Sequence, residues 1–163
     1  KGAYILKEAS SAPKIVIIAT GSEVGIALDV QIALEKDGHS TRVVSAPCLE
    51  WFNEQTPAYQ ESVLPKKSLR VSIEAGIAQG WREYVGDSGV IISLDHFGAS
   101  ASGNKLFTEF GFTPDAFLDF LTGNYIQQLQ IPNADLSAIV KGSPMLLTIV
   151  SGEIIAIEGV DAP

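Results

Sequence analysis

Cysteine and histidine are scarce in this sequence: its 163 residues contain one cysteine and two histidines. A single cysteine cannot form an internal disulfide, so the sequence does not suggest a secreted, disulfide-stabilised protein. Ligand pairs at metal-binding spacings, such as C-x-x-C or H-x-x-x-H, are missing as well. We therefore expect no metal site in this chain.

Long apolar runs and clusters of cations are missing too. No run approaches the roughly 20 apolar residues that span a bilayer, and the polar N-terminal stretch does not resemble a signal peptide. Asp and Glu total 19 against 11 Lys and Arg, which gives a net charge of −8. Because nucleic-acid binding needs clustered cations, we expect no nucleic-acid and no membrane partner, and a cytoplasmic location.

The composition is that of a folded domain, with 46% hydrophobic and 18% charged residues. The chain is long enough to bury a substantial core. It begins with Lys1 rather than Met, so we expect it to be a piece of a longer protein.

The stretch around which the sequence is organised is KIVIIATGSE, residues 14–23. Its continuous run of apolar, mostly β-branched residues predicts a strand buried on both faces, as in a parallel sheet. Gly21 permits a tight turn. Ser22 is a candidate N-cap for a following helix, and Glu23 places a negative charge in its first turn.

Strands and helices are predicted to alternate along the next hundred residues, which predicts a three-layer α/β domain with a mostly parallel sheet. The predicted strands cover residues 2–7, 15–19, 41–46, 68–73 and 89–94. The predicted helices cover residues 24–36 and 57–64, a segment through 81–85, 105–110 and a segment that starts at Thr113 and Pro114.

The C-terminal part of the sequence has a different character. Residues 122–143 are polar, and the apolar runs 145–150 and 154–157 flank Ser151 and Gly152, which predicts a hairpin. We therefore divide the chain into a domain of residues 1–121 and an appended tail of residues 122–163.

Thr20, Gly21 and Ser22 form a candidate anion-binding turn, because helix N-termini after parallel strands often hold phosphate groups. The alternative is a tight turn that only starts a helix. We favour that alternative, since neither G-x-G-x-x-G nor G-x-x-x-x-G-K-[ST] is present and Glu23 would repel a phosphate.

Three further side chains lie in predicted strand-end loops. His96 could act as a general acid or base, although it has no identifiable partner. Cys48 could be a nucleophile only beside a base or cation, and a small buried hydrophobe is the favoured interpretation. Glu74, in IEAG, could cap a helix or bind a partner across an interface. The aromatic residues are interpreted as core or as a docking surface: Trp51, Phe52, Trp81 and Tyr84.

These stretches together resemble the C-terminal domain of transketolase. The matching motifs occur in the family's order over about residues 1–120: GAYIL, IATGSEV, RVVSAPCLEWF, AYQESVLP, RVSIEAGIAQGW, YVG, HFGASA and EFGFTPD. HFGASA and EFGFTPD favour transketolase over the related deoxyxylulose-phosphate synthases and 2-oxoacid dehydrogenase components. The tail beyond Leu121 does not match the family.

The resemblance implies a mixed five-stranded sheet with one antiparallel edge strand, formed by GAYIL. It implies a homodimeric parent enzyme that transfers a two-carbon ketol unit between sugar phosphates. That enzyme uses thiamine diphosphate and a divalent metal, Mg²⁺ or Ca²⁺, held between two other domains at the dimer interface. Gly86, Asp87 and Ser88 do not complete the family's G-D-G diphosphate motif, so no catalytic, cofactor-binding or metal-binding residue is carried over.

The leading hypothesis is therefore a non-catalytic structural domain of a transketolase, which braces the other domains of the same chain and the dimer. A regulatory anion- or nucleotide-binding module at the Gly21–Ser22 turn is the second hypothesis. A free-standing enzyme that uses His96 and Cys48 is the third.

Overall fold

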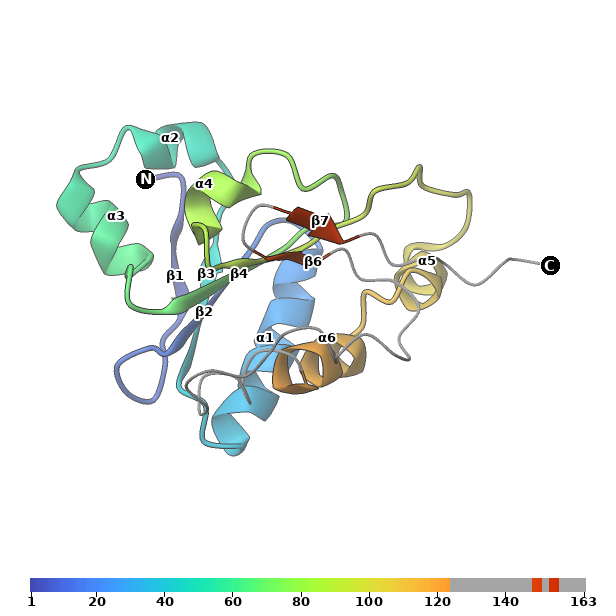
Figure 1. Ribbon diagram of the computed structural model, residues 1–163, viewed down its shortest axis with the longest axis horizontal. Coiled ribbons are helices and arrows are strands. Elements are labelled where there is room, and N and C mark those ends of the chain that lie inside the picture. The colour runs from blue at the N-terminus through green and yellow to red at the C-terminus, as the bar shows by residue number, and fades with distance from the viewer. Residues whose placement is uncertain (124–147, 151–152, 156–163) are drawn as a thin grey trace.

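A mixed five-stranded sheet forms the centre of the computed structural model, which describes residues 1–123, 148–150 and 153–155 (Figure 1). The strands are β1 (Tyr4–Lys7), β2 (Ile15–Ala19), β3 (Thr41–Ser45), β4 (Leu69–Ile73) and β5 (Val90–Ile92). They lie in the order β1-β3-β2-β4-β5. Within this sheet β1 runs antiparallel to β3 and the other three pairs are parallel, which confirms the expected mixed sheet with one antiparallel edge strand.

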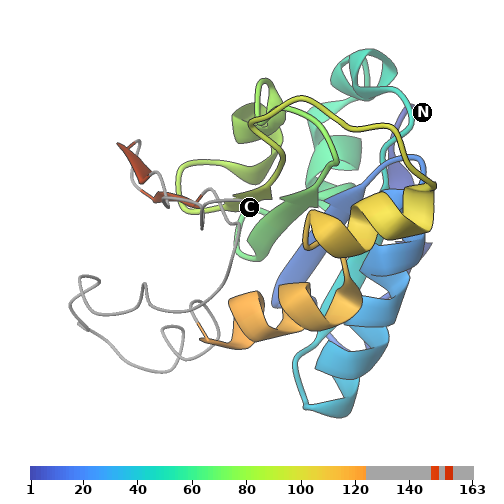
Figure 2. The same cartoon turned by 90° about the vertical axis from the view of Figure 1, so that its right-hand side faces the viewer.

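Helices cover both faces of this sheet (Figures 1 and 2). One face packs against α1 (Glu23–Lys36), α5 (Gly103–Glu109) and α6 (Pro114–Leu121). The other packs against α2 (Leu49–Asn53), α3 (Pro57–Val63) and α4 (Trp81–Val85). The predicted three-layer α/β architecture is therefore confirmed.

The middle strand β2 divides the core into two clusters. Because successive side chains of a strand point to opposite faces, Ile15 and Ile17 pack toward α1 and α6, whereas Val16 and Ile18 pack toward α2, α3 and α4. All five residues of β2 are buried, which is why its sequence is continuously apolar rather than alternating.

Local capping signals place two helix starts correctly. Thr56 and Thr113 cap α3 and α6, since each hydroxyl accepts a backbone N–H of the first turn. The prediction that Ser22 caps α1 is wrong. Ser22 has helical backbone angles, and its Oγ donates to Glu23 Oε2 over 3.0 Å instead of accepting a backbone N–H. An N-cap residue normally has extended backbone angles, which place its side-chain oxygen near the N–H groups of the first turn, and the helical angles of Ser22 do not.

Helix α2 is an element that the sequence did not reveal. Pro47 and Cys48 indicated only a turn, yet five residues after them form a helix. Cys48 occupies its N-cap without a side-chain hydrogen bond. The helix depends instead on tertiary packing, because Phe52 is buried beside Tyr59 and Tyr84.

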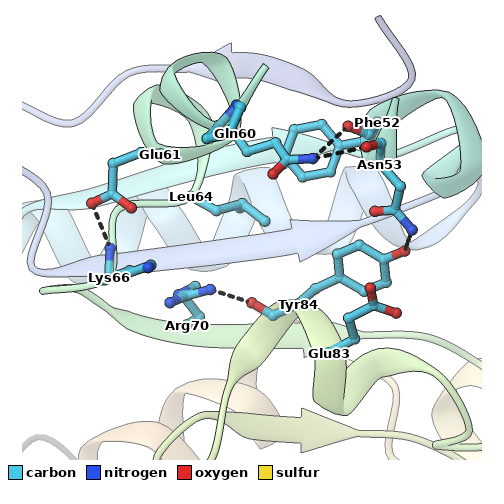
Figure 3. Close-up of a pocket in the computed structure, with 10 residues that line it drawn as sticks. Phe52, Asn53, Gln60, Glu61, Leu64, Lys66, Arg70, Glu83 and Tyr84 are labelled. Carbon is cyan, nitrogen blue, oxygen red and sulfur yellow. Dashed lines mark hydrogen bonds between the residues drawn. The ribbon is translucent and has the colours of Figure 1, made fainter. Parts of the chain in front are cut away.

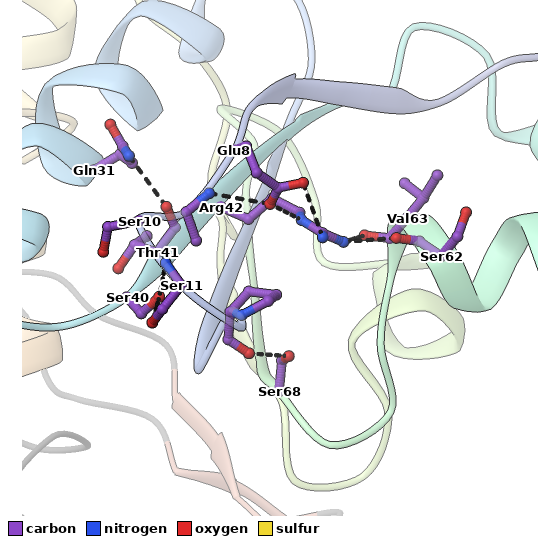
Figure 4. A network of polar contacts seen from close by, with 12 residues as sticks. Glu8, Ser10, Ser11, Gln31, Ser40, Thr41, Arg42, Ser62, Val63 and Ser68 are labelled. Atoms are coloured by element: carbon purple, nitrogen blue, oxygen red, sulfur yellow. Dashed lines mark hydrogen bonds and ion pairs between the residues drawn. The ribbon is translucent and has the colours of Figure 1, made fainter.

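A buried arginine ties β1, β3 and α3 together (Figure 4). Arg42 of β3 donates to both carboxylate oxygens of Glu8, at 2.7 and 3.1 Å. Its third nitrogen, Nη1, donates to the carbonyl oxygens of Ser62 and Val63 at the end of α3, at 2.7 and 3.0 Å. The guanidinium thus satisfies its donors although Arg42 is buried.

Beyond α6, the described residues form two short strands. β6 (Thr148–Val150) and β7 (Glu153–Ile155) pair antiparallel, with Val150 opposite Glu153. The connecting residues 151–152 and the predicted polar segment from residue 124 onward lie outside the described residues. The domain boundary after Leu121 stays a prediction.

Gly89 is a glycine that close packing requires. A Cβ placed there would lie 2.3 Å from the Val85 carbonyl oxygen and 2.5 Å from Val85 Cβ. We expect Gly89→Ala to lower the free energy of unfolding by about 1–3 kcal/mol, since backbone must move. Gly25 is the matched control, because nothing lies near its Cβ position in α1. Gly25→Ala should raise stability by about 0.5–1 kcal/mol. Urea denaturation measures both, and equal effects would contradict this packing.

The Glu8–Arg42 ion pair predicts a loss of stability in acid. The hydrogen bond from Arg42 lowers the pKa of Glu8 against an opposing effect of burial. Because the folded pKa lies below the unfolded one, the pair's contribution is complete above the unfolded pKa and is lost as pH falls through the folded pKa.

We therefore expect Glu8→Gln to destabilise the protein at neutral pH and to match the wild type near about pH 2–3. Urea denaturation over this pH range measures the difference. Glu54→Gln is the control, because it removes a carboxylate that is exposed and makes no ion pair with a described residue. A Glu8→Gln deficit that does not shrink in acid would show that the pair is not its source.

Candidate functional site

The carboxyl ends of β2, β3, β4 and β5 meet at one edge of the sheet, because these strands are parallel. This is the edge where α/β folds usually place ligands. Backbone hydrogen bonds tie the strand ends together there: Ala46 N donates to Ala19 O, Glu74 N to Ile92 O and Leu94 N to Gly76 O, over 2.8–3.0 Å. These bonds join the ends of neighbouring strands to one another.

Glu23 lies at the centre of this edge and is only 5% exposed. Its Oε1 accepts the Ala75 backbone N–H over 3.2 Å, and its Oε2 accepts the Ser22 hydroxyl. The protein's own carboxylate therefore uses two donors that an anion would need. Thr20, Gly21 and Ser22 surround this charge, and their anion-binding role stays a prediction that Coulomb repulsion from Glu23 disfavours.

Glu74 lies beside Glu23 and is half-buried. Burial, and secondly the charge of Glu23, raise the pKa of Glu74 above its usual value. Its side chain folds over Gly76, whose absent Cβ would lie 3.5 Å from Glu74 Cγ. Helix α4 begins only at Trp81, after Gly80 as N-cap, so the helix-cap interpretation of Glu74 is wrong. Its role toward a partner stays a prediction.

The structure does not bring His96 and Cys48 together. Cys48 follows β3 and His96 follows β5, and β2 and β4 lie between these strands. Three strand spacings, about 14 Å, separate the two strands, and Cys48 and His96 each contact other residues rather than one another.

The immediate surroundings of these two residues also differ from the sequence-based interpretation. His96 is exposed, with Nδ1 2.8 Å from Phe97 O and its ring against Phe110. Cys48 is half-buried rather than buried, with Sγ 3.5 Å from Glu50 Oε2. Glu50 is acidic and cannot supply the cationic surroundings that activate a thiol.

Among the described residues, no group of three or more His, Cys, Asp or Glu side chains is placed to hold a metal ion. In the same part of the chain, no helix combines the length and hydrophobicity that crossing a bilayer requires.

The aromatic residues divide between core and surface. Phe52, Trp81 and Tyr84 are buried and contact one another in pairs, which confirms their interpretation as core. Trp51 is 62% exposed on α2. Sequence reasoning missed two exposed apolar residues in the loops after β4 and β5, namely Ile77 at 62% and Phe97 at 98% exposed.

Sequence reasoning also missed a pocket between α3 and α4. It has a volume of about 630 Å³ and lies over β4, away from the strand-end loops (Figure 3). The lining residues are Phe52, Asn53, Pro57, Gln60, Glu61, Leu64, Lys66, Arg70, Glu83 and Tyr84. These residues come from separate segments of the sequence that share no motif. The pocket becomes visible only when α2, α3 and α4 are packed side by side on one face of the sheet.

The Glu23–Glu74 pair generates a prediction about titration. We expect Glu23→Gln to lower the pKa of Glu74 part of the way to its usual value, because the charge of Glu23 is removed while burial remains. The amide oxygen of Gln can still accept the Ala75 N–H. A ¹³C-detected carboxyl titration measures the shift, with Asp29→Asn on the exposed face of α1 as control. An unchanged Glu74 titration would show that the two carboxylates do not interact.

Comparison with known proteins agrees with this geometry. Residues 2–113 match the family model of the transketolase-like TK C-terminal domain. The chain is 47% identical over 121 residues to transketolase of Mycobacterium leprae, a match covering 71% of the chain and 17% of that protein. It is 49% identical over 116 residues to transketolase of Aquifex aeolicus, with the same coverage of 71% and 17%.

A crystal structure of Pichia stipitis transketolase in complex with sedoheptulose 7-phosphate superposes with a TM-score of 0.68 at 35% identity. It covers 75% of this chain and 18% of the transketolase chain. The chain thus spans about a sixth of the length of the relatives that it matches. Sheet order, motif order and family model agree, and the chain belongs to the family of transketolase-like C-terminal domains.

Proposed function

We propose that this chain is the C-terminal, non-catalytic structural domain of a transketolase, and that it braces the subunit and the dimer of its parent enzyme. The family match over residues 2–113 is the observation on which the proposal rests. The parent would transfer a two-carbon ketol unit between sugar phosphates in the cytoplasm. Its partners would be the other domains of the same polypeptide and a second copy of it.

The exposed apolar residues of the strand-end loops support a bracing role. Phe97 and Ile77 follow neighbouring strands, and Leu94 N donates to Gly76 O between their loops. Scattered exposed hydrophobic residues are ordinary, but a phenylalanine that is 98% exposed would gain the most from a covering surface. The domain would present this edge to the rest of the enzyme.

Thiamine diphosphate and its divalent metal, Mg²⁺ or Ca²⁺, do not fit the described residues. The nearest stretch to a diphosphate motif, residues 86–88, follows α4 as a closed turn. Arg82 Nη1 donates to the carbonyl oxygens of Gly86, Asp87 and Gly89 over 2.9–3.3 Å. These contacts fill the turn with a side chain of the protein itself. The cofactor and the catalytic groups would belong to the parent's other domains.

The related alternatives are deoxyxylulose-phosphate synthase and 2-oxoacid dehydrogenase components. The similar proteins described above are transketolases, which favours transketolase as the parent. A regulatory anion or nucleotide at Gly21 and Ser22 is the other alternative, and the buried carboxylate of Glu23 argues against it.

The proposal predicts that the 163-residue chain alone neither binds the cofactor nor transfers ketol units. Isothermal titration calorimetry with thiamine diphosphate and Mg²⁺ should show no binding, and a coupled ketol-transfer assay no turnover. Stoichiometric binding or turnover by this chain alone would overturn the proposal.

A chimera provides the positive arm of this test. The matching C-terminal segment of Aquifex aeolicus transketolase would be replaced by residues 1–121 of this chain. We expect the chimera to form dimers and to retain ketol-transfer activity, whereas the truncated enzyme without any C-terminal domain should lose stability. A folded, dimeric and inactive chimera would show that the two domains are not equivalent.

A further inference from the structure

The structure contains two arginines that occupy equivalent positions on either side of β2. Arg42 of β3 and Arg70 of β4 are both paired with Val16 in the sheet register. In-register residues of parallel strands point to the same face, so both guanidinium groups lie on the face covered by α2, α3 and α4. They can therefore be compared directly.

The two arginines differ in what they bind. Arg42 contacts a carboxylate and two carbonyl oxygens. Arg70 is half-buried, and among the described residues it makes a single hydrogen bond, from Nη1 to Tyr84 O over 2.6 Å. The ion pair between Arg42 and Glu8 has no counterpart at Arg70 in the described part of the chain. A guanidinium has five N–H donors, so Arg70 keeps donors that a further acceptor could use.

Arg70 faces the 630 Å³ pocket, and Lys66 lines the same pocket (Figure 3). The Lys66 ammonium likewise has no carboxylate partner among the described residues. The pocket volume falls within the roughly 300–1,000 Å³ typical of small-molecule sites. Two cations at one concave site would attract a phosphate or carboxylate group.

The remaining lining groups favour hydrogen-bonding ligands. Asn53 Nδ2 donates to Tyr84 Oη over 2.9 Å, so the Tyr84 hydroxyl proton can be donated to a ligand. Gln60 Nε2 donates to the carbonyl oxygens of Phe52 and Asn53. This leaves the amide oxygens of Asn53 and Gln60 as acceptors.

Carboxylates also line this pocket, and they restrict the ligand. Glu61 Oε1 accepts the Lys66 backbone N–H over 3.1 Å, and Glu83 lies near Tyr84. These carboxylates repel the charge of any anion, but they can accept hydrogen bonds from hydroxyl groups that the same ligand carries. Phe52 and Leu64 contribute apolar surface to the same pocket.

We propose that the pocket between α3 and α4 binds a small organic anion that carries several hydroxyl groups, with its phosphate or carboxylate on Arg70 and Lys66. The hydroxyl groups would bond Glu83, Asn53 and Tyr84. This site is separate from the strand-end loops, and it does not depend on the proposed bracing function.

Titration of the ¹⁵N-labelled 163-residue chain, followed by NMR, tests the site. Gluconate is the carboxylate probe, glycerol 3-phosphate is the phosphate probe, and glycerol is the uncharged control. We expect saturable shifts of the Arg70 Nε–H and of the Lys66 and Arg70 amides with at least one anion and none with glycerol. The stronger anion identifies the preferred head group. No saturable shift with either anion would overturn the proposal.

Two neighbouring lysines provide a matched pair of variants. Lys66 lines the pocket and Lys67 does not, although both are exposed and adjacent. We expect Lys66→Gln to weaken binding about tenfold, as expected for one charge-assisted hydrogen bond, and Lys67→Gln to leave it unchanged. Equal weakening by the two would show attraction by net charge alone and would overturn the site.

Arg70→Gln should weaken binding at least as much as Lys66→Gln, provided that its spectrum shows the native fold. Shifts confined to residues 20–23 would also contradict the proposal, because they would place the anion at the opposite candidate turn.

Discussion

The in-register parallel pairing of β2 with both β3 and β4 is the constraint on which the rest of the structure depends. Ile15–Ala19 is aligned residue by residue with Thr41–Ser45 on one side and Leu69–Ile73 on the other. This alignment requires crossovers through α1 and through α2 and α3, so it sets the layers. It also brings the strand ends to one edge, and it places Arg42 and Arg70 in a single row across the sheet.

Much of this architecture could be predicted from local sequence. The apolar run of β2 indicated burial on both faces, and the Thr-Pro pairs at Thr56 and Thr113 marked helix starts, because a cap and a fixed φ act within one turn of chain. Helix α2 was missed, since Phe52 holds it through contacts with Tyr59 and Tyr84. The Ser22 cap failed because the backbone is already helical at Ser22, which the residue types around it do not reveal.

The candidate sites were harder to predict than the fold. A turn after a parallel strand is a local pattern, and the sequence located Thr20, Gly21 and Ser22 without difficulty. Sequence could not show that the Glu23 carboxylate turns back to accept the Ala75 amide. The pocket at Arg70 and Lys66 depends on three helices meeting on one face, and no spacing of residues encodes that meeting. Charge partners, more than residue types, distinguish Arg42 from Arg70.

The short strand β1 has a consequence for how copies of this chain behave in concentrated solution. It forms an outer border of the sheet, where unpaired backbone groups can recruit a strand from another molecule. Its pairing is irregular between Ile5 and Lys7, and Lys7 carries a charge at that irregularity. Natural proteins use β-bulges, short edge strands and lysine side chains to prevent a strand of another molecule from pairing with a sheet edge. By these features, the edge strand β1, which the Glu8–Arg42 ion pair holds against β3, is protected against edge-to-edge aggregation.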